Sequence, residues 1–169
     1  MGTDRARGTV PPASWQEMEK LGLAQVDFVY VTGDAYIDHP SFGSAIITRV
    51  LMDAGFTVGL ICQPDWHDPE VFRALGRPKL AFLVSSGNID SMVNHYTANL
   101  RLRHDDAYTP GGKAGFRPDR AVTVYSQILK RLYPHVPVVI GGIEASLRRL
   151  THYDYWSDAL KPSVLADSG

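Results

Sequence analysis

Three polar loops of the sequence carry the side chains best suited to bind a ligand. The first, TGDAYIDHPSFG at residues 32–43, follows an apolar run and precedes a predicted helix. It offers carboxylates, an imidazole and a hydroxyl from Asp34, Asp38, His39 and Ser41. The free N–H groups at the start of a helix attract anions, so this loop is a candidate ligand contact. An equally supported alternative is that Asp38 or Ser41 only caps the helix.

The other two loops follow later apolar runs. VSSGN at residues 84–88 offers a hydroxyl and an amide from Ser86 and Asn88, although ordinary turn chemistry explains it almost as well. GGIEASLRR at residues 141–149 has two glycines that let the backbone approach a ligand closely. Its alternative is a plain strand-to-helix turn with solvated arginines. This loop supplies the strongest candidates, which are Gly141, Gly142, Glu144 and Ser146.

Several familiar catalytic patterns are absent from the sequence. It has no G-x-G-x-x-G dinucleotide fingerprint and no G-x-S-x-G nucleophile elbow. Lys113 stands beside two glycines, but Ala114 follows it where a phosphate loop needs Ser or Thr. No two histidines have the H-x-x-x-H spacing, and the single cysteine, Cys62, cannot form an internal disulfide or a thiolate metal site. The sequence therefore predicts no complete catalytic apparatus.

The elements that must position these loops form an alternating pattern. Apolar segments at residues 26–31, 57–61, 79–84 and 136–140 predict strands buried on both faces. Helices are predicted between them, at residues 43–54, 68–75, 89–98 and, capped by Asp119, 121–132. The pattern predicts an α/β fold with a doubly wound, mostly parallel, Rossmann-like sheet and helices on both faces. The loops after the strands then share the edge at which such sheets bind ligands.

Two segments of the sequence have distinctive patterns of their own. Residues 43–54 set Ile46, Ile47, Val50, Leu51 and Ala54 at helical spacing, the pattern of a stripe that packs on a sheet. Residues 99–118 are polar and unusually long for a connection in a compact domain. We interpret them as an insertion or a binding loop, and the overlapping string YTPGGKAGFRPDR as a mobile lid or a docking surface.

Composition restricts the class of protein. The chain has 169 residues, 44% of them hydrophobic and 21% charged, which fits one globular domain. Its net charge of -1 argues against a nucleic-acid interface. It has no apolar run long enough for a membrane span and only one cysteine, so we expect a cytoplasmic protein. We expect residues 1–14 to be a disordered leader and residues 15–169 to be the domain.

Four strings in the same order resemble the amino-terminal region of the YgiQ family of radical SAM proteins. They are TGDAYIDHPSFG, QPDW, YTPGGKAGFRPDR and GGIEASLRRLTHYDYW, and the resemblance covers about residues 15–169. The family places such a region before a radical SAM barrel. The resemblance therefore implies a 4Fe–4S cluster, bound by three cysteines of a C-x-x-x-C-x-x-C loop, together with S-adenosylmethionine. This chain lacks that loop, so the ligands are expected beyond Gly169, in a barrel on the same polypeptide.

The chain is also similar, more distantly, to the cobalamin-binding domains of other radical SAM enzymes. The likeness lies in P-S-x-G at residues 40–43 and in the glycine pair Gly141 and Gly142. The D-x-H-x-x-G motif that supplies a histidine to cobalt is missing around His39. The resemblance implies a cobalamin-binding-domain-like fold and leaves cobalamin without a predicted protein ligand.

These observations lead to three hypotheses about function. In the first, the domain covers a radical SAM barrel, and the polar loops contact the barrel or an unknown small-molecule or macromolecular substrate. In the second, it is a non-catalytic module for cobalamin or a nucleotide-like ligand. In the third, it is a structural docking domain whose interface includes Arg148, Arg149 and the HYDYW string.

Overall fold

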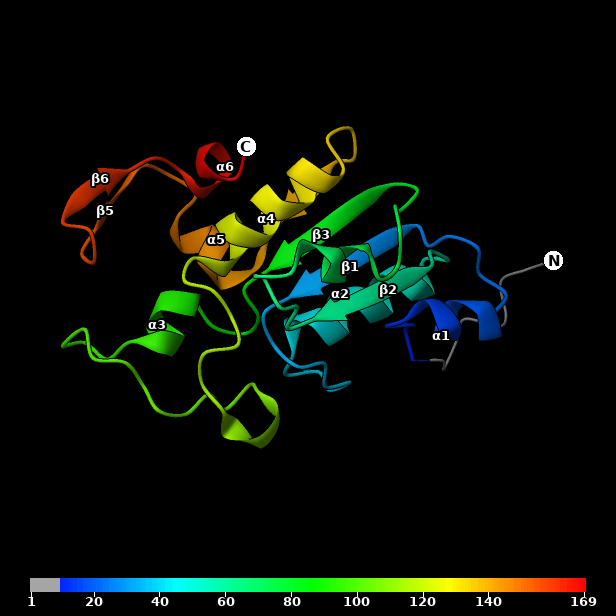
Figure 1. The fold of residues 1–169 in the computed structure, drawn as a ribbon, viewed down its shortest axis with the longest axis horizontal. Helices are drawn as coiled ribbons and strands as arrows, with labels where there is room; N and C mark the ends of the chain where they lie inside the picture. Colours follow the sequence, from blue (N-terminus) through cyan, green and yellow to red (C-terminus); the bar gives the residue numbers. More distant parts are fainter. Residues whose placement is uncertain (1–9) are drawn as a thin grey trace.

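A four-stranded parallel sheet forms the centre of the molecule. The computed structural model describes residues 10–169, and within them the sheet has the strand order β2-β1-β3-β4 (Figure 1). Central Tyr30 lies beside Leu60 on one side and Leu83 on the other. The predicted doubly wound α/β fold is confirmed. The strands are β1 (Phe28–Thr32), β2 (Val58–Cys62), β3 (Ala81–Ser85) and β4 (Val138–Ile140).

Helices and a small hairpin surround this sheet. Some are shorter than the sequence predicts: the helix expected at residues 89–98 spans only Ser91–His95, and the one expected at 68–75 is a 3-10 helix. The helices are α1 (Trp15–Lys20), α2 (Gly43–Asp53), η1 (Pro69–Arg73), α3 (Ser91–His95), η2 (Pro110–Gly112), α4 (Ala121–Leu132), α5 (Gly142–Leu147) and α6 (Val164–Asp167). The hairpin consists of antiparallel β5 (His152–Asp154) and β6 (Ala159–Lys161).

Hydrophobic clusters of unequal size lie on the two faces of the sheet. The larger core lies under α4 and η1, where Val29, Val31 and Phe82 pack with Phe72 and Tyr125. A smaller cluster forms on the other face, which α2 covers. Figure 1 shows α4 on the near face and α2 on the far face. The main core therefore fixes the strands from the α4 side.

Helix α2 is turned the opposite way from the sequence prediction. It buries Ser44, Ala45 and Thr48 against the sheet and leaves Ile46, Ile47 and Val50 exposed, together with Ala54 beyond its end, while Leu51 is half-buried. The predicted stripe is therefore wrong for most of its members. The reason is steric: large side chains such as those of Tyr30 and Leu60 fill the sheet face below, and small helix residues fit over them.

The amino-terminal segment protects the outer edge of the sheet. Residues 1–9 of the expected leader lie outside the described residues, but Pro11 and Pro12 are buried. The Pro12 carbonyl accepts a hydrogen bond of 2.8 Å from the Leu60 N–H, on edge strand β2. Proline is well suited to such an edge because it offers no N–H to another strand. Ordered structure therefore starts before residue 15.

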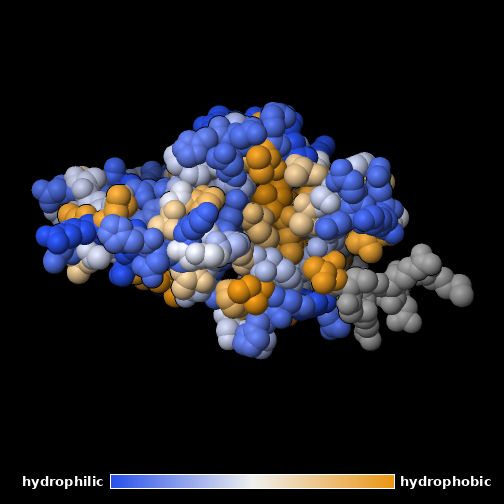
Figure 2. All heavy atoms as spheres, turned by 60° about the horizontal axis from the view of Figure 1, so that its bottom comes forward, coloured by the Kyte–Doolittle hydropathy of each residue, from blue (hydrophilic) through white to orange (hydrophobic). Residues whose placement is uncertain are grey.

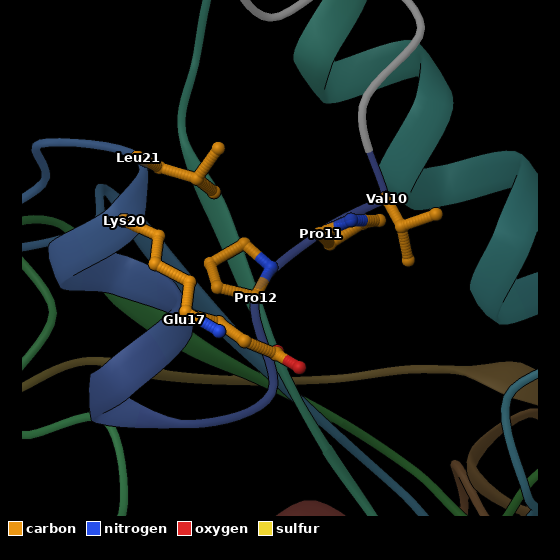
Figure 3. Close-up of a pocket in the computed structure, with 6 residues that line it drawn as sticks. All are labelled: Val10, Pro11, Pro12, Glu17, Lys20 and Leu21. Carbon is orange, nitrogen blue, oxygen red and sulfur yellow. The ribbon is translucent and has the colours of Figure 1, made fainter.

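An open pocket of about 280 Å³ lies between this segment and α1 (Figure 3). Pro11 and Pro12 face α1 across it, and the stems of Glu17 and Lys20 line its other side. None of the polar loops that follow the strands contributes to its lining. The pocket is therefore separate from the candidate site.

The start of α4 differs from the prediction. Asp119 does not cap this helix: the N-cap is Arg120, in the left-handed conformation with φ 51° and no side-chain cap bond. The Asp119 carboxylate instead contacts His95 Nδ1 at 2.7 Å and accepts a 2.9 Å hydrogen bond from the Tyr96 hydroxyl. It thus ties the end of α3 to the start of α4.

Candidate functional site

The loops after β1, β3 and β4 meet at one edge of the sheet. The Gly33 N–H donates to the Ser85 carbonyl at 3.3 Å, and the Gly141 N–H donates to the Val84 carbonyl at 2.9 Å. The Asn88 N–H donates to Asp34 Oδ2 at 2.6 Å. Parallel strands bring their carboxyl ends to the same edge, as the sequence predicts. The structure therefore brings the three predicted loops together.

Asp34 lies inside this edge rather than on its surface. Its carboxylate is buried and lies 3.0 Å from Arg117 Nη2. Gly87 passes so close that a Cβ there would lie 2.0 Å from Asp34 Oδ1, and its φ of 110° also favours glycine. Asp34 is thus enclosed by its own chain.

Arg117 is the centre of a buried charge network that sequence reasoning missed. Its side chain is fully buried, and Nη2 lies 2.8 Å from Asp106 Oδ2 as well as 3.0 Å from Asp34 Oδ1. Nη1 donates to the Ser86 carbonyl at 2.9 Å. One guanidinium thereby joins the loop after β1, the loop after β3 and the segment at residues 105–117.

The pKa values of the two carboxylates of this network are shifted in opposite directions. Burial is the largest influence on Asp34 and raises its pKa, against the Asn88 N–H and Arg117, which lower it. Burial also raises the pKa of Asp106, but the Tyr108 N–H and Arg117 outweigh it, so the net shift is downward. Asp106 is therefore the carboxylate that more firmly holds the negative charge opposite Arg117.

Residues 105–117 close the place where a doubly wound sheet usually binds its ligand. In the order β2-β1-β3-β4 the direction of winding changes between β1 and β3, and ligands occupy the crevice there. Arg117 fills this crevice, and the Ala35 N–H donates to the Tyr108 carbonyl at 3.0 Å. Gln63 Nε2 donates to Thr109 Oγ1 at 2.6 Å. This segment therefore seals the edge and is anchored to it by buried bonds.

The exposed rim of the site is formed by residues 38–41. Asp38 forms an ion pair with Arg49, and His39 Nδ1 accepts a 3.1 Å hydrogen bond from the Ser41 N–H. Asn88 supports the rim, because its Oδ1 accepts from the Gly43 N–H at 3.1 Å and its Nδ2 donates to the Ser41 carbonyl at 3.0 Å. The Asn88 side chain thus serves the start of α2. The alternative in which Asp38 or Ser41 caps this helix is wrong, since no side chain caps it from the N-cap position.

Glu144 is fully buried and bridges two helix starts. Oε2 accepts a 2.9 Å hydrogen bond from the Ser91 N–H of α3, and Oε1 accepts one of 2.9 Å from the Val122 N–H of α4. Two otherwise unpaired N–H groups at helix starts are satisfied by one carboxylate. Its predicted neighbours differ, because Gly142 and Ser146 are exposed and Gly141 is half-buried.

Two further ion pairs fix the chain around α5. Arg148, predicted as part of an interface, forms an ion pair with buried Asp90, which also caps α3. Arg120 forms another with buried Asp154, to which Ser157 also donates. Of the residues proposed for docking, Arg148 and Asp154 thus form ion pairs within the domain, whereas Tyr155 is exposed.

The described residues do not fit an iron–sulfur cluster or another metal. Residues 10–169 contain no group of three or more His, Cys, Asp or Glu side chains that could hold a metal ion. Burial raises the pKa of Cys62 to about 11, which disfavours the thiolate that a metal needs. The closed edge does not fit cobalamin either, because Arg117 occupies the crevice. No helix in this part of the chain is long and apolar enough to cross a membrane.

Comparison with known proteins identifies the family. Residues 11–169 match the family described as Radical SAM N-terminal. A UPF0313 protein of Clostridium botulinum is 59% identical over 157 residues, which are 93% of this chain and 25% of the relative. UPF0313 proteins of Bradyrhizobium diazoefficiens and Shewanella oneidensis are each 60% identical, over 99% and 95% of this chain and 25% and 21% of their own lengths.

The chain thus spans about a quarter of the length of the curated relatives it matches. No solved structure matches it. The predicted resemblance to the YgiQ family is confirmed by these UPF0313 relatives and by the matching family. The chain belongs to the radical SAM N-terminal family.

Proposed function

We propose that this chain is the domain with which a radical SAM enzyme covers the mouth of its catalytic barrel. The rim at Asp38, His39 and Ser41, held by Asn88, contacts the barrel or the substrate. The edge behind the rim keeps water away from the radical intermediate. The 4Fe–4S cluster and S-adenosylmethionine are bound by the remainder of the polypeptide, where together they generate a carbon-centred radical.

The observation that carries this proposal is the closed edge. Arg117 fills the crevice between β1 and β3 and bonds to both flanking loops. Because Arg117 fills the crevice, this edge presents a closed protein surface and leaves no room for a cofactor. A closed surface of this kind suits a domain that covers the barrel mouth and excludes water.

The same observation weighs against the alternative of a cobalamin or nucleotide module. Such a ligand would have to displace a guanidinium that contacts two buried carboxylates. Glu144 and Ser86 are also engaged, since the Ser86 hydroxyl donates to the Ile89 carbonyl at 2.9 Å. We therefore propose that Asp34, Ser86 and Glu144 hold the fold behind the rim and do not contact a ligand themselves.

The proposal is tested by the rate of S-adenosylmethionine cleavage in the full-length protein with its cluster reconstituted. We expect Asp38→Ala and His39→Ala each to change this rate by about tenfold or more, because a displaced cover mispositions the reacting groups. Both side chains lie on the exposed rim, so folding should be preserved. The matched control is Arg131→Ala, an exposed residue of α4 remote from the rim, which should react at the wild-type rate.

Two results would contradict the proposal. If the wild-type protein with an intact cluster failed to cleave S-adenosylmethionine, it would lack the radical SAM activity that the proposal assumes. Rim variants that match both the wild type and Arg131→Ala would show that the rim contacts nothing that affects the reaction.

A further inference from the structure

Helix α2 is largely apolar on the side that faces away from its own domain, with the exposed Asp53 as its last residue. Its inner side chains, Ser44 and Thr48, pack on the sheet, while Ile46 is 47% exposed and Val50 62% exposed. A surface helix normally carries charged or polar residues on its outer side, and a helix that is apolar on both sides is buried on both. The outer side of α2 therefore has the character of an interior surface.

The sheet beside α2 has an uncovered half on the same face. α2 contacts β1 and β2, whereas β3 and β4 are covered by α4 on the opposite face. Val139 of β4 points away from α4, and it is 54% exposed, although its neighbours Val138 and Ile140 pack against the main core. Parallel sheets are almost always covered on both faces. The apolar sequence of β4 suits burial on both faces, but only the face toward α4 is covered.

Further hydrophobic surface adjoins this region of the chain. Ile143 and Leu147 follow β4 on α5, four residues apart on one stripe, and both are more than half exposed. Figure 2 views the molecule from the lower edge of Figure 1 and shows hydrophobic residues gathered around a central hollow there, whereas the outer side of α2 lies on the far face and is turned away in this view. An isolated exposed leucine needs no explanation, but several on adjoining elements indicate an interface.

We propose that the outer side of α2 (Ile46, Ile47, Val50), Val139, and the exposed stripe of α5 form one docking face, and that it is covered by the polypeptide following residue 169. Matched relatives are about four times as long as this chain, and the matching family is described as N-terminal. The last helix, α6, packs on α4, and Val164 is buried in the main core. Polypeptide leaving α6 therefore starts on the α4 side of the sheet, and it reaches the uncovered half by passing around the sheet.

This docking face is distinct from the rim at the carboxyl edge. Its α2 and Val139 parts lie on the flat side of the sheet, its α5 part follows β4, and none of its residues belongs to the Asp34–Arg117–Asp106 network. The inference rests on the proposed function only in taking a long following polypeptide to be present. It requires neither a cluster nor any reaction, so it can hold where the proposed chemistry fails.

Thiol labelling of the full-length protein tests the inference. Ile46→Cys, Val50→Cys and Val139→Cys are each treated with a maleimide, and labelling at each position is followed by peptide mass spectrometry. Arg131→Cys, on the exposed side of α4, is the matched control. We expect the three docking-face thiols to react at least about tenfold more slowly than the control, because labelling requires local opening of the interface.

A photo-crosslinking amino acid at position 46 identifies what covers the face. The inference expects a crosslink within one chain to a peptide beyond residue 169. Docking-face thiols that react as fast as Arg131→Cys would show an open face and overturn the inference. A crosslink between two chains, with protection lost on dilution, would assign the face to a second copy and would also overturn it.

Discussion

Replacing Arg117 with methionine is expected to lower the free energy of unfolding by about 3–5 kcal/mol, because it leaves two buried carboxylates without their shared cation. Asp34 and Asp106 lie 3.0 Å and 2.8 Å from the guanidinium and have little access to water. Methionine fills part of the volume but offers no donor to either carboxylate or to the Ser86 carbonyl. The loss is measured by urea unfolding, followed by tryptophan fluorescence.

Arg101→Met is the matched control for this experiment. Arg101 is exposed in the same long connection, so its replacement should change stability by no more than about 0.5 kcal/mol. Arg117→Lys keeps the charge but loses the planar fork that reaches several acceptors at once, and should recover only part of the loss. If Arg117→Met behaved like Arg101→Met, the buried network would not hold the edge together.

Replacing Glu144 with alanine should cost about 3 kcal/mol, because two buried N–H groups lose their acceptor at a cost of about 1–3 kcal/mol each. The Ser91 and Val122 N–H groups both bond to this carboxylate at 2.9 Å. Glu144→Gln keeps one acceptor oxygen and should fall between the wild type and alanine. The measurement is again the midpoint and slope of urea unfolding.

Ser146→Ala provides the comparison on the same helix. Its exposed hydroxyl donates only to the Gly142 carbonyl one turn earlier, so we expect a change below about 0.5 kcal/mol. If Glu144→Ala also lowered the free energy of unfolding by less than about 0.5 kcal/mol, the bridging role would be refuted. That result would return Glu144 to the group of ligand-facing candidates.

The sequence predicts the framework well because strand signals are local. Four apolar β-branched runs separated by helical segments are enough to predict a parallel sheet, and with it the shared edge of the loops after β1, β3 and β4. The orientation of α2 could not be predicted in the same way. Periodicity finds an apolar stripe but does not say whether that stripe meets its own sheet or another layer, and here Ile46 and Val50 face outward.

The sequence predicts where the candidate site lies but not which of its side chains are buried. Asp34, Ser86 and Glu144 were selected because they are polar and follow strands, and the structure uses all three inside the fold. Arg117 carried no local signal, because an arginine in a polar, glycine-rich loop is normally solvated. Its burial depends on Asp34, distant in sequence, and no spacing rule connects the two.

Hydrogen exchange of residues 105–117 in the full-length protein tests the central claim that this segment permanently closes the edge. The Asp106, Thr109 and Gly112 N–H groups are hydrogen-bonded within the segment, which Arg117 anchors from its end. We expect exchange at least about 100-fold slower than in an unfolded chain, because such a segment rarely opens. Exchange at the rate of an unfolded chain would show a mobile lid and would contradict it.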